Sequence, residues 1–296
     1  MSFQPEAPGD WGVMREIPDV RATAETLLTA DGCPHFVRGW VNEHATRVLL
    51  ILHGLGGHSG WYIDLGNVLA EQGITVYAMD HRGFGRSGGM AGHIDRYRTY
   101  IDDVVFMLAE IRKRHPEAAI YLLGHSMGGL FATYVAARHG EDLAGVILLN
   151  SWIQDTAKVP SLTVLQILMG GLLGSQRYWT VGDGAKSMTI NPEAIQMLEA
   201  DSYWGKRQTA AMLVQVLQMR LAALARARQV TIPALVLQAE DDAAVSIGTN
   251  RKLYEHLASH DKTWKDYPGY HHDSQFEHDR SRLDADLIAW LKEHAG

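Results

Sequence analysis

The sequence predicts an α/β protein with a mostly parallel, doubly wound sheet and a helical insertion. Two observations lead to this class. Short branched apolar runs, such as VLLIL at 48–52 and ITVYAM at 74–79, alternate along the chain with amphipathic segments. Buried parallel strands contact helices on both faces, so they appear as continuous apolar runs separated by crossover helices. The alternation stops between Trp152 and Gln229, where Leu, Met and Ala dominate.

The elements follow in order along the chain. Residues 25–29 and 35–41 predict an antiparallel hairpin at the sheet edge, turning at Asp31-Gly32. Buried parallel strands are predicted at 48–52, 74–79, 120–123, 146–149, 234–237 and 262–267. Helices are predicted at 97–115, 126–139, 246–260 and 281–294; apolar residues recur at spacings of three and four in the first, and Pro116 ends it.

The chain divides into a core and an insertion. With 296 residues it has the size of one large α/β unit. We expect residues 1–151 and 230–296 to form the two parts of the core. Residues 152–229 contain no convincing buried strand and are predicted to form a helical cap or lid.

Composition excludes several classes of function. The net charge of −7 and the absence of any Lys/Arg-rich run disfavour a nucleic-acid partner, which requires clustered cations. The single cysteine, Cys33, excludes an intrachain disulfide and has no nearby base, so we expect an inert thiol. No signal peptide and no run of about 18 apolar residues is evident. We therefore expect a cytoplasmic protein.

The strongest chemical signal is the pattern G-x-S-x-G at 124–128. It follows the strand IYLL and opens the apolar segment LFATYVAARHG. A strained turn between a strand and a helix projects the serine hydroxyl from the sheet edge, and glycines let neighbouring backbones pass closely. A glycine-rich turn with an incidental serine is the alternative, which this context disfavours. Ser126 is therefore the candidate nucleophile.

A serine hydroxyl needs a base, and the base needs an acid to orient it. An acidic turn, Glu240-Asp241-Asp242, follows the strand at 234–237, and the pair His271-His272 follows the strand at 262–267. Both loops are predicted at the carboxyl edge of the sheet beside Ser126. From the residues alone, the choice among the acids and between the two histidines stays open.

A second turn supplies candidates for an oxyanion hole, which requires two backbone N–H donors. One donor is predicted at Met127, directly after the nucleophile. The sequence His53-Gly54-Leu55-Gly56-Gly57 follows an early strand and brings bare backbone close to a ligand, so Leu55 is the second candidate. A turn selected only for its tightness is the alternative.

Taken together, these motifs resemble one known family. HGLGGHSGWY, MDHRGFGRSGG, GHSMGG, LQAEDD and YPGYHHD are similar to the monoacylglycerol lipase and lysophospholipase-like branch of the α/β-hydrolases, from about residue 22 to the end. The resemblance implies the α/β-hydrolase fold and ester hydrolysis without a cofactor. It also implies Ser126 as nucleophile, Asp242 as acid, His272 as base, and Leu55 and Met127 as oxyanion donors. The chain departs from the family at His271, where a smaller or aromatic residue is usual.

The expected substrate is a small ester with an apolar acyl chain. Candidate substrate-binding residues are His53, Gly54, His125 and Trp152. The apolar stretches 162–173 and 212–219 either pack the cap onto the core or line an acyl channel, and an outward apolar face would contact a lipid interface transiently. The oligomeric state stays open.

Other patterns in the sequence indicate different functions. Residues 83–88 match G-x-G-x-x-G but do not open a helix directly, which disfavours a dinucleotide site. Fifteen histidines suggest a metal, yet no H-E-x-x-H or paired-Cys motif is present, so no metal is expected. A serine peptidase of the proline-iminopeptidase type and a non-catalytic binding protein remain the alternative functions.

Overall fold

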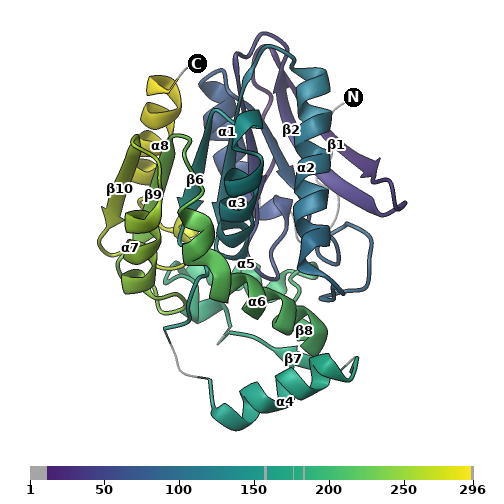
Figure 1. Cartoon of the computed structure of the whole chain (residues 1–296). Coiled ribbons are helices and arrows are strands. Elements are labelled where there is room, and N and C mark those ends of the chain that lie inside the picture. Colours follow the sequence, from purple (N-terminus) through teal and green to yellow (C-terminus); the bar gives the residue numbers. More distant parts are fainter. Residues whose placement is uncertain (1–11, 157–158, 176, 183, 295–296) are drawn as a thin grey trace.

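The computed structural model describes residues 12–156, 159–175, 177–182 and 184–294 (Figure 1). Within them, eight strands form one sheet in the order β1-β2-β4-β3-β5-β6-β9-β10. The bounds are β1 Val20–Leu28, β2 Pro34–Asn42, β3 Arg47–Leu52, β4 Thr75–Met79, β5 Ala119–His125, β6 Gly145–Leu149, β9 Ala234–Ala239 and β10 Lys262–Tyr267. The pairs β1–β2 and β2–β4 are antiparallel and the other pairs are parallel, which confirms the predicted mostly parallel sheet with an edge hairpin.

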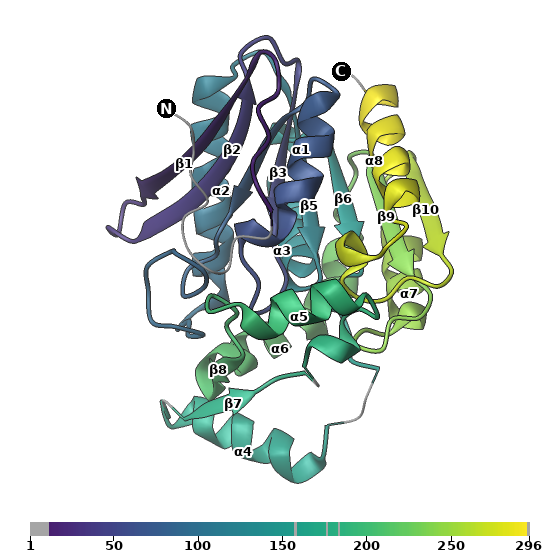
Figure 2. The same cartoon turned by 180° about the vertical axis from the view of Figure 1, so that it is seen from behind.

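Helices cover both faces of the sheet. Figure 1 shows α2 and α3 in front of it, and Figure 2 shows α1 and α8 on the opposite face. The bounds are α1 Ile63–Glu71, α2 Tyr97–Arg114, α3 Met127–Arg138, α4 Ser161–Leu172, α5 Pro192–Ala200, α6 Ala210–Ala227, α7 Ile247–His256 and α8 Ser281–Glu293. Short 3-10 helices span Ser59–Tyr62, Gly140–Asp142, Ala185–Ser187 and Ser274–Phe276.

Strand β3 shows how this arrangement follows from the sequence. Val48, Leu50 and Leu52 pack in the apolar cluster with α2 and α3, whereas Leu49 and Ile51 pack with α1 and α8. Side chains alternate between the two faces of a strand, and both faces of this sheet are covered. An uninterrupted apolar run is therefore required here, which is why such runs located the central strands correctly.

The segment 152–229 lies beyond the carboxyl ends of the strands, at the bottom of Figures 1 and 2. It contains α4, α5 and α6, together with a two-stranded antiparallel ribbon of β7 (Tyr178–Thr180) and β8 (Arg207–Thr209). The prediction of no buried strand was wrong for this ribbon, because Gln208 and Thr209 are buried. Three-residue strands are too short to give a periodic signal.

Helix α6 is long and apolar enough to cross a membrane by length and composition alone. Its side chains Met212, Val216 and Met219 are nevertheless buried in the cluster that contains α3, and the Tyr134 hydroxyl donates to the Met219 carbonyl at 2.9 Å. These contacts are those of a helix packed on a core. Helix α4, in contrast, has no buried residue.

Some elements differ from the sequence expectation, among them β1, which begins at Val20 rather than residue 25. Helix α1 was not predicted, and α7 ends at His256 rather than near residue 260. At the end of α7 the Leu257 N–H bonds to the carbonyls of Leu253 and Tyr254, and the backbone then becomes extended and leads into β10.

Gly66 of α1 provides a test of this packing. A Cβ at Gly66 would lie 2.6 Å from ring carbons of the buried Trp40 on β2. We expect Gly66→Ala to lower the free energy of unfolding by about 1–3 kcal/mol through overpacking, despite the helix propensity of alanine. Urea denaturation measures the change.

The matched control is Gly248→Ala in α7, where a Cβ would meet nothing within 4 Å. We expect this variant to be as stable as the wild type, or more stable by up to about 1 kcal/mol. Equal losses in both variants would contradict the packing of α1 against Trp40.

Candidate active site

Ser126 lies on a sharp turn between β5 and α3. Its backbone has φ 54° and ψ −114°, a region that costs non-glycine residues about 1–3 kcal/mol. The Ser126 N–H donates to the Leu149 carbonyl of β6 at 2.9 Å, which helps to hold the turn. A Cβ at Gly124 would collide with the Gly128 carbonyl, and one at Gly128 with the Leu52 carbonyl. The two flanking glycines therefore make the turn possible.

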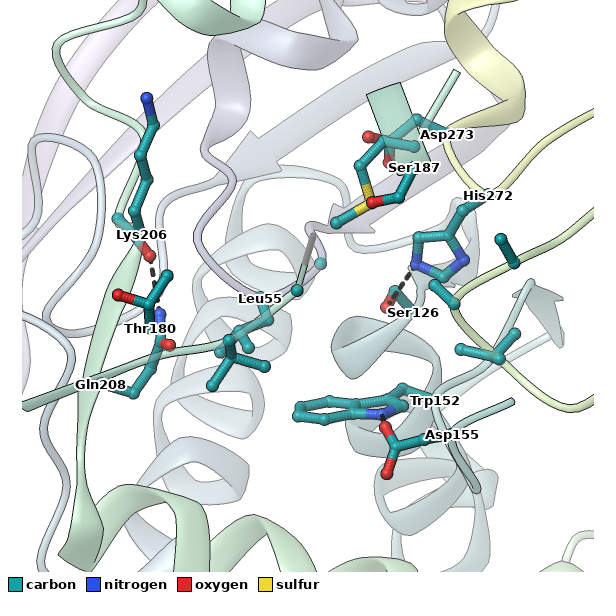
Figure 3. Close-up of a pocket in the computed structure, with 18 of the residues that line it drawn as sticks. Leu55, Ser126, Trp152, Asp155, Thr180, Ser187, Lys206, Gln208, His272 and Asp273 are labelled. Carbon is teal, nitrogen blue, oxygen red and sulfur yellow. Dashed lines mark hydrogen bonds between the residues drawn. The ribbon is translucent and has the colours of Figure 1, made fainter. Parts of the chain in front are cut away.

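Three side chains from distant loops meet at this turn. The Ser126 hydroxyl lies 2.9 Å from His272 Nε2 (Figure 3). On the other side of the ring, His272 Nδ1 lies 2.8 Å from Asp242 Oδ2. The other Asp242 oxygen accepts from the amides of Ala244 and Val245 at 2.8 and 2.9 Å. Because a carboxylate only accepts, His272 carries its proton on Nδ1, and Nε2 is free to accept from Ser126.

Burial and charge act in opposite directions on this pair. Burial lowers the pKa of His272, but the adjacent Asp242 carboxylate raises it, and the net pKa lies above the ordinary value of 6.5. Burial raises the pKa of Asp242, but His272 and the Val245 and Ala244 amides lower it, and the net shift is downward. The pair therefore stabilises a proton on the imidazole beside an ionised carboxylate.

The structure separates the alternatives that the residues left open. His271 contacts Glu277 through its amide and its Nδ1, at 3.0 and 3.1 Å, and only His272 reaches Ser126. Glu240 and Asp241 are exposed, whereas Asp242 is buried.

The two candidate oxyanion donors flank Ser126. Met127 is the first residue of α3, so its amide has no acceptor within the helix. Leu55 lies in the wall of the cavity that contains Ser126. The backbone at Gly54, just before Leu55, lies close to the nucleophile: a Cβ at Gly54 would lie 3.1 Å from Ser126 Cβ. Glycine at this position therefore lets the Leu55 loop approach the nucleophile.

The other sequence candidates divide into two groups. Gly54, His125 and Trp152 line the cavity. His53 does not: its ring is fully buried, with Nε2 accepting from the His81 amide at 2.9 Å. Burial lowers the pKa of His53 to about 3, so the ring is neutral. His53 supports the turn from below and is not placed to contact a substrate.

His125 lines the cavity, but both of its ring nitrogens already have partners. Nδ1 accepts from the Tyr62 hydroxyl at 3.1 Å, and Nε2 donates to the His272 carbonyl at 3.0 Å. Burial lowers the pKa of His125 to about 3, which keeps the ring neutral. The ring therefore supports the His272 loop. His125 was predicted to bind substrate, which differs from this supporting task, and its partner Tyr62 was not predicted.

The cavity has a volume of about 420 Å³ and lies between the sheet edge and the segment 152–229 (Figure 3). Most of its wall is apolar, formed by Leu55, Trp61, Trp152, Val159, Pro160, Val181, Met188, Trp204, Ala243, Ala244 and Val245. Polar side chains that include Thr180, Lys206 and Gln208 lie across the cavity from Ser126. Such a wall suits a ligand that is largely apolar.

Trp152 is held in the cavity wall by a pair that the sequence did not reveal. Its indole N–H donates to Asp155 Oδ1 at 2.6 Å, and Arg220 of α6 binds Asp155 Oδ2 at 2.6 Å. The Arg220 guanidinium also lies over the Trp152 ring, 4.8 Å from its centroid. Arg220 is 65 residues from Asp155, so no local pattern could indicate this contact.

A second buried contact connects the segment 152–229 to the loop after β3. Asp201 accepts from His58 Nε2 and from Trp61 Nε1, each at 2.8 Å, and the Gly205 amide donates to the Gly56 carbonyl at 2.8 Å. His58 and Trp61 belong to the motif HGLGGHSGWY, but only the fold brings Asp201 to them.

Two other patterns lie outside this site. Residues 83–88 form a turn, and the next helix, α2, begins only at Tyr97, so a phosphate there would have no helix N-terminus to contact. In the part of the chain that the structure describes, His139, Glu141 and Asp142 have metal-ligand spacing, but they lie at the end of α3 opposite Ser126.

Comparisons with known proteins show which proteins the chain is similar to. Residues 43–279 match the family described as "Serine aminopeptidase, S33". The chain is 30% identical over 250 residues to a monoglyceride lipase of Mus musculus, covering 83% of this chain and 82% of that protein. It is 26% identical over 258 residues to a monoacylglycerol lipase of Mycolicibacterium smegmatis, covering 86% and 91%. The crystal structure of a Paleococcus ferrophilus monoacylglycerol lipase superimposes with a TM-score of 0.77 at 25% identity, covering 84% and 96%.

The histidine environments can be measured directly. We expect His272 to gain its second proton as the pH falls through a value above 6.5, and His125 to stay neutral until about pH 3. Titration of imidazole ¹⁵N shifts by NMR measures both pKa values.

The variant Asp242→Asn tests whether the Asp242 carboxylate is the cause of the raised His272 pKa. Removing the carboxylate should lower the pKa of His272 and leave that of His125 near its wild-type value. A His272 pKa below 6.5 in the wild type would contradict the hydrogen-bonded pair.

Proposed function

The chain belongs to the serine aminopeptidase S33 family of the α/β-hydrolases, and we propose that it is a serine ester hydrolase that acts on monoacylglycerol-like lipids through an acyl-enzyme on Ser126. Its fold is the α/β-hydrolase fold, and its similarity to lipases identifies a hydrolase of the carboxylesterase and lipase type. The observation that carries the proposal is the hydrogen-bonded chain from Ser126 through His272 to Asp242.

In the proposed first half-reaction, Ser126 Oγ attacks the ester carbonyl carbon while its proton moves to His272 Nε2. Asp242 stabilises the imidazolium that forms, as the raised pKa of His272 supports. The Leu55 and Met127 amides donate to the oxyanion of the tetrahedral intermediate. The intermediate collapses, the bond to the alcohol oxygen breaks, and the alcohol leaves with the proton from His272.

In the second half-reaction water replaces the alcohol. His272 takes a proton from the water as the water oxygen attacks the acyl carbon, and the second tetrahedral intermediate uses the same two amides. Its collapse returns the proton to Ser126 Oγ and releases the carboxylic acid. The serine, imidazole and carboxylate are thus regenerated by the chain's own groups.

The cavity supports a lipid ester over a peptide substrate. A peptidase of the proline-iminopeptidase type needs unpaired acidic groups to bind the substrate amine. Asp155 is paired with Arg220, and burial raises the pKa of Asp273 to about 6 because its surroundings disfavour the charged form. The Lys206 ammonium over Trp204, also in the wall, disfavours a cationic substrate further.

We further propose that residues 152–229 act as a cap whose helix α4 contacts lipid surfaces. Every residue of α4 is at least partly exposed, and the exposed fractions reach 67% for Leu162, 55% for Leu165 and 79% for Leu172. Contiguous exposed apolar side chains beside a ligand cavity are a feature of membrane or lipid contact sites. Docking through α4 would bring the cavity entrance to the lipid.

The nucleophile is tested by Ser126→Ala. We expect hydrolysis of p-nitrophenyl butyrate and of a monoacylglycerol to fall by about 10⁴-fold or more, because no other group can carry the acyl chain. A fluorophosphonate probe should label the wild type and fail to label this variant.

The control is Ser281→Ala, which removes an exposed hydroxyl at the start of α8 and should leave both readouts unchanged. Labelling of Ser126→Ala, or activity within tenfold of wild type, would remove Ser126 from the proposed role. An unlabelled wild type without activity would instead support a non-catalytic binding protein.

The lipid contact of α4 is tested by the double variant Leu165→Gln/Leu172→Gln. We expect its activity on monoacylglycerol in phospholipid vesicles to fall about 10-fold, because two apolar side chains no longer enter the interface. Activity on soluble p-nitrophenyl butyrate should stay within twofold of wild type.

Leu28→Gln is the matched control, since Leu28 is 65% exposed but lies on the edge strand β1, far from α4 (Figure 1). Equal vesicle activity in the double variant and the wild type would refute lipid docking through α4.

A further inference from the structure

Asn150 follows β6 directly and has an unusual backbone conformation. Its φ is 44°, in the left-handed region that asparagine tolerates better than most residues with side chains. The residue is fully buried, and its N–H donates to the Leu237 carbonyl of β9 at 3.0 Å. No sequence motif marks this position, and Asn150 has no task in the proposed mechanism.

The Asn150 amide bonds to two loops of the candidate site at once. Its Oδ1 accepts from the Ala239 amide at 2.8 Å, three residues before Asp242. Its Nδ2 donates to the His272 carbonyl at 2.7 Å and to Ser274 Oγ at 2.8 Å. One side chain therefore joins the loop that carries the acid to the loop that carries the histidine.

The partners define the orientation of this amide. The Ala239 N–H can only donate and the His272 carbonyl can only accept, so Oδ1 must face the first and Nδ2 the second. Aspartate would keep the acceptor but lose both donors, whereas glycine would keep the backbone conformation and lose every side-chain contact. Asparagine satisfies both requirements.

The same His272 carbonyl also accepts from His125 Nε2 at 3.0 Å. Two buried side chains, His125 and Asn150, thus donate to the main-chain carbonyl of His272. His125 ends β5, and Asn150 follows β6. Its side chain is held separately by Asp242. Fixing the main chain and the ring together restricts the position of Nε2 relative to Ser126 Oγ.

We propose that Asn150 is a positioning residue that holds the His272 loop in register with Ser126 and Asp242. This inference rests on the proposed function, since it assumes that His272 is the base. The side chain acts through the carbonyl of His272 and does not contact the substrate. Misplacement of a reacting group by about 1 Å can cost about 100-fold in rate, so loss of this clamp should be measurable.

The test uses Asn150→Gly in the full chain, with active sites counted by end-point fluorophosphonate labelling. We expect kcat per labelled site to fall about 10- to 100-fold, with KM for p-nitrophenyl butyrate within threefold of wild type. Because a loosened loop weakens the Asp242–His272 contact, the acid limb of the kcat/KM profile should also move to lower pH.

Asn150→Asp keeps the acceptor for the Ala239 amide but loses the Nδ2 donor. We expect the same loss of kcat, which would assign the effect to the donor and not to the acceptor. Ser274→Ala is the matched comparison: it removes one partner of Nδ2 and the bond from the Ser274 hydroxyl to the His271 carbonyl, but it leaves the bond from Asn150 to the His272 carbonyl. We expect its kcat to stay within threefold of wild type. An unchanged kcat per labelled site in Asn150→Gly, or an equal loss in Ser274→Ala, would overturn the proposal.

These outcomes differ from failure of the proposed function itself. If Ser126 were not the nucleophile, the wild type would not be labelled at Ser126 in the first place. A variant that is merely less stable would show fewer labelled sites, with wild-type kcat and pH profile per site.

Discussion

The hydrogen bond between Ser126 and His272 joins residues that are 146 positions apart, and the sheet edge is organised around it. Ser126 is at the end of β5, Asp242 follows β9, and His272 follows β10, so every member stands at a carboxyl end of a parallel strand. Parallel pairing brings these ends to one edge, and crossover helices keep them there. The Ser126–His272 contact can therefore form only when the whole sheet is assembled. The local conformation of each residue is set by its own loop.

Much of the surrounding polar structure serves to fix geometry. The rings of His53 and His125 are buried and neutral, and each uses its nitrogens to support a neighbouring turn. Asp242 accepts from two amides in addition to His272. Buried polar groups that are fully hydrogen-bonded are rigid, and an arrangement fixed before the substrate binds needs little reorganisation during the reaction. The strained backbones of Ser126 and Asn150 are held within this network.

Local patterns predicted the features that depend on neighbours in the chain. Apolar runs identified β3, β4, β5, β6 and β9 because both faces of the sheet are covered, and G-x-S-x-G identified the Ser126 turn because its glycines are required by close backbone contacts.

Features that depend on distant partners were not predictable in the same way. The residues alone did not distinguish His271 from His272, since the difference lies in which ring faces Ser126 and which faces Glu277. His53 was expected at the ligand and lies beneath the turn, because its partner is the His81 amide, 28 residues away. The Arg220–Asp155 pair and the Asn150 contacts likewise exist only after the chain has folded.

The contact of Asp201 with His58 and Trp61 has a consequence for how this chain can change over evolution. It ties the segment that contains Asp201 to the loop that carries Leu55, so the two parts are energetically linked. Such a linkage is reciprocal. A change that stabilises the position of the segment also stabilises the loop, and a change that stabilises the loop also stabilises the position of the segment. Substitutions that reshape the segment for a new ligand are therefore constrained to preserve the Asp201 contact, just as they must preserve the packing of α6 on the core.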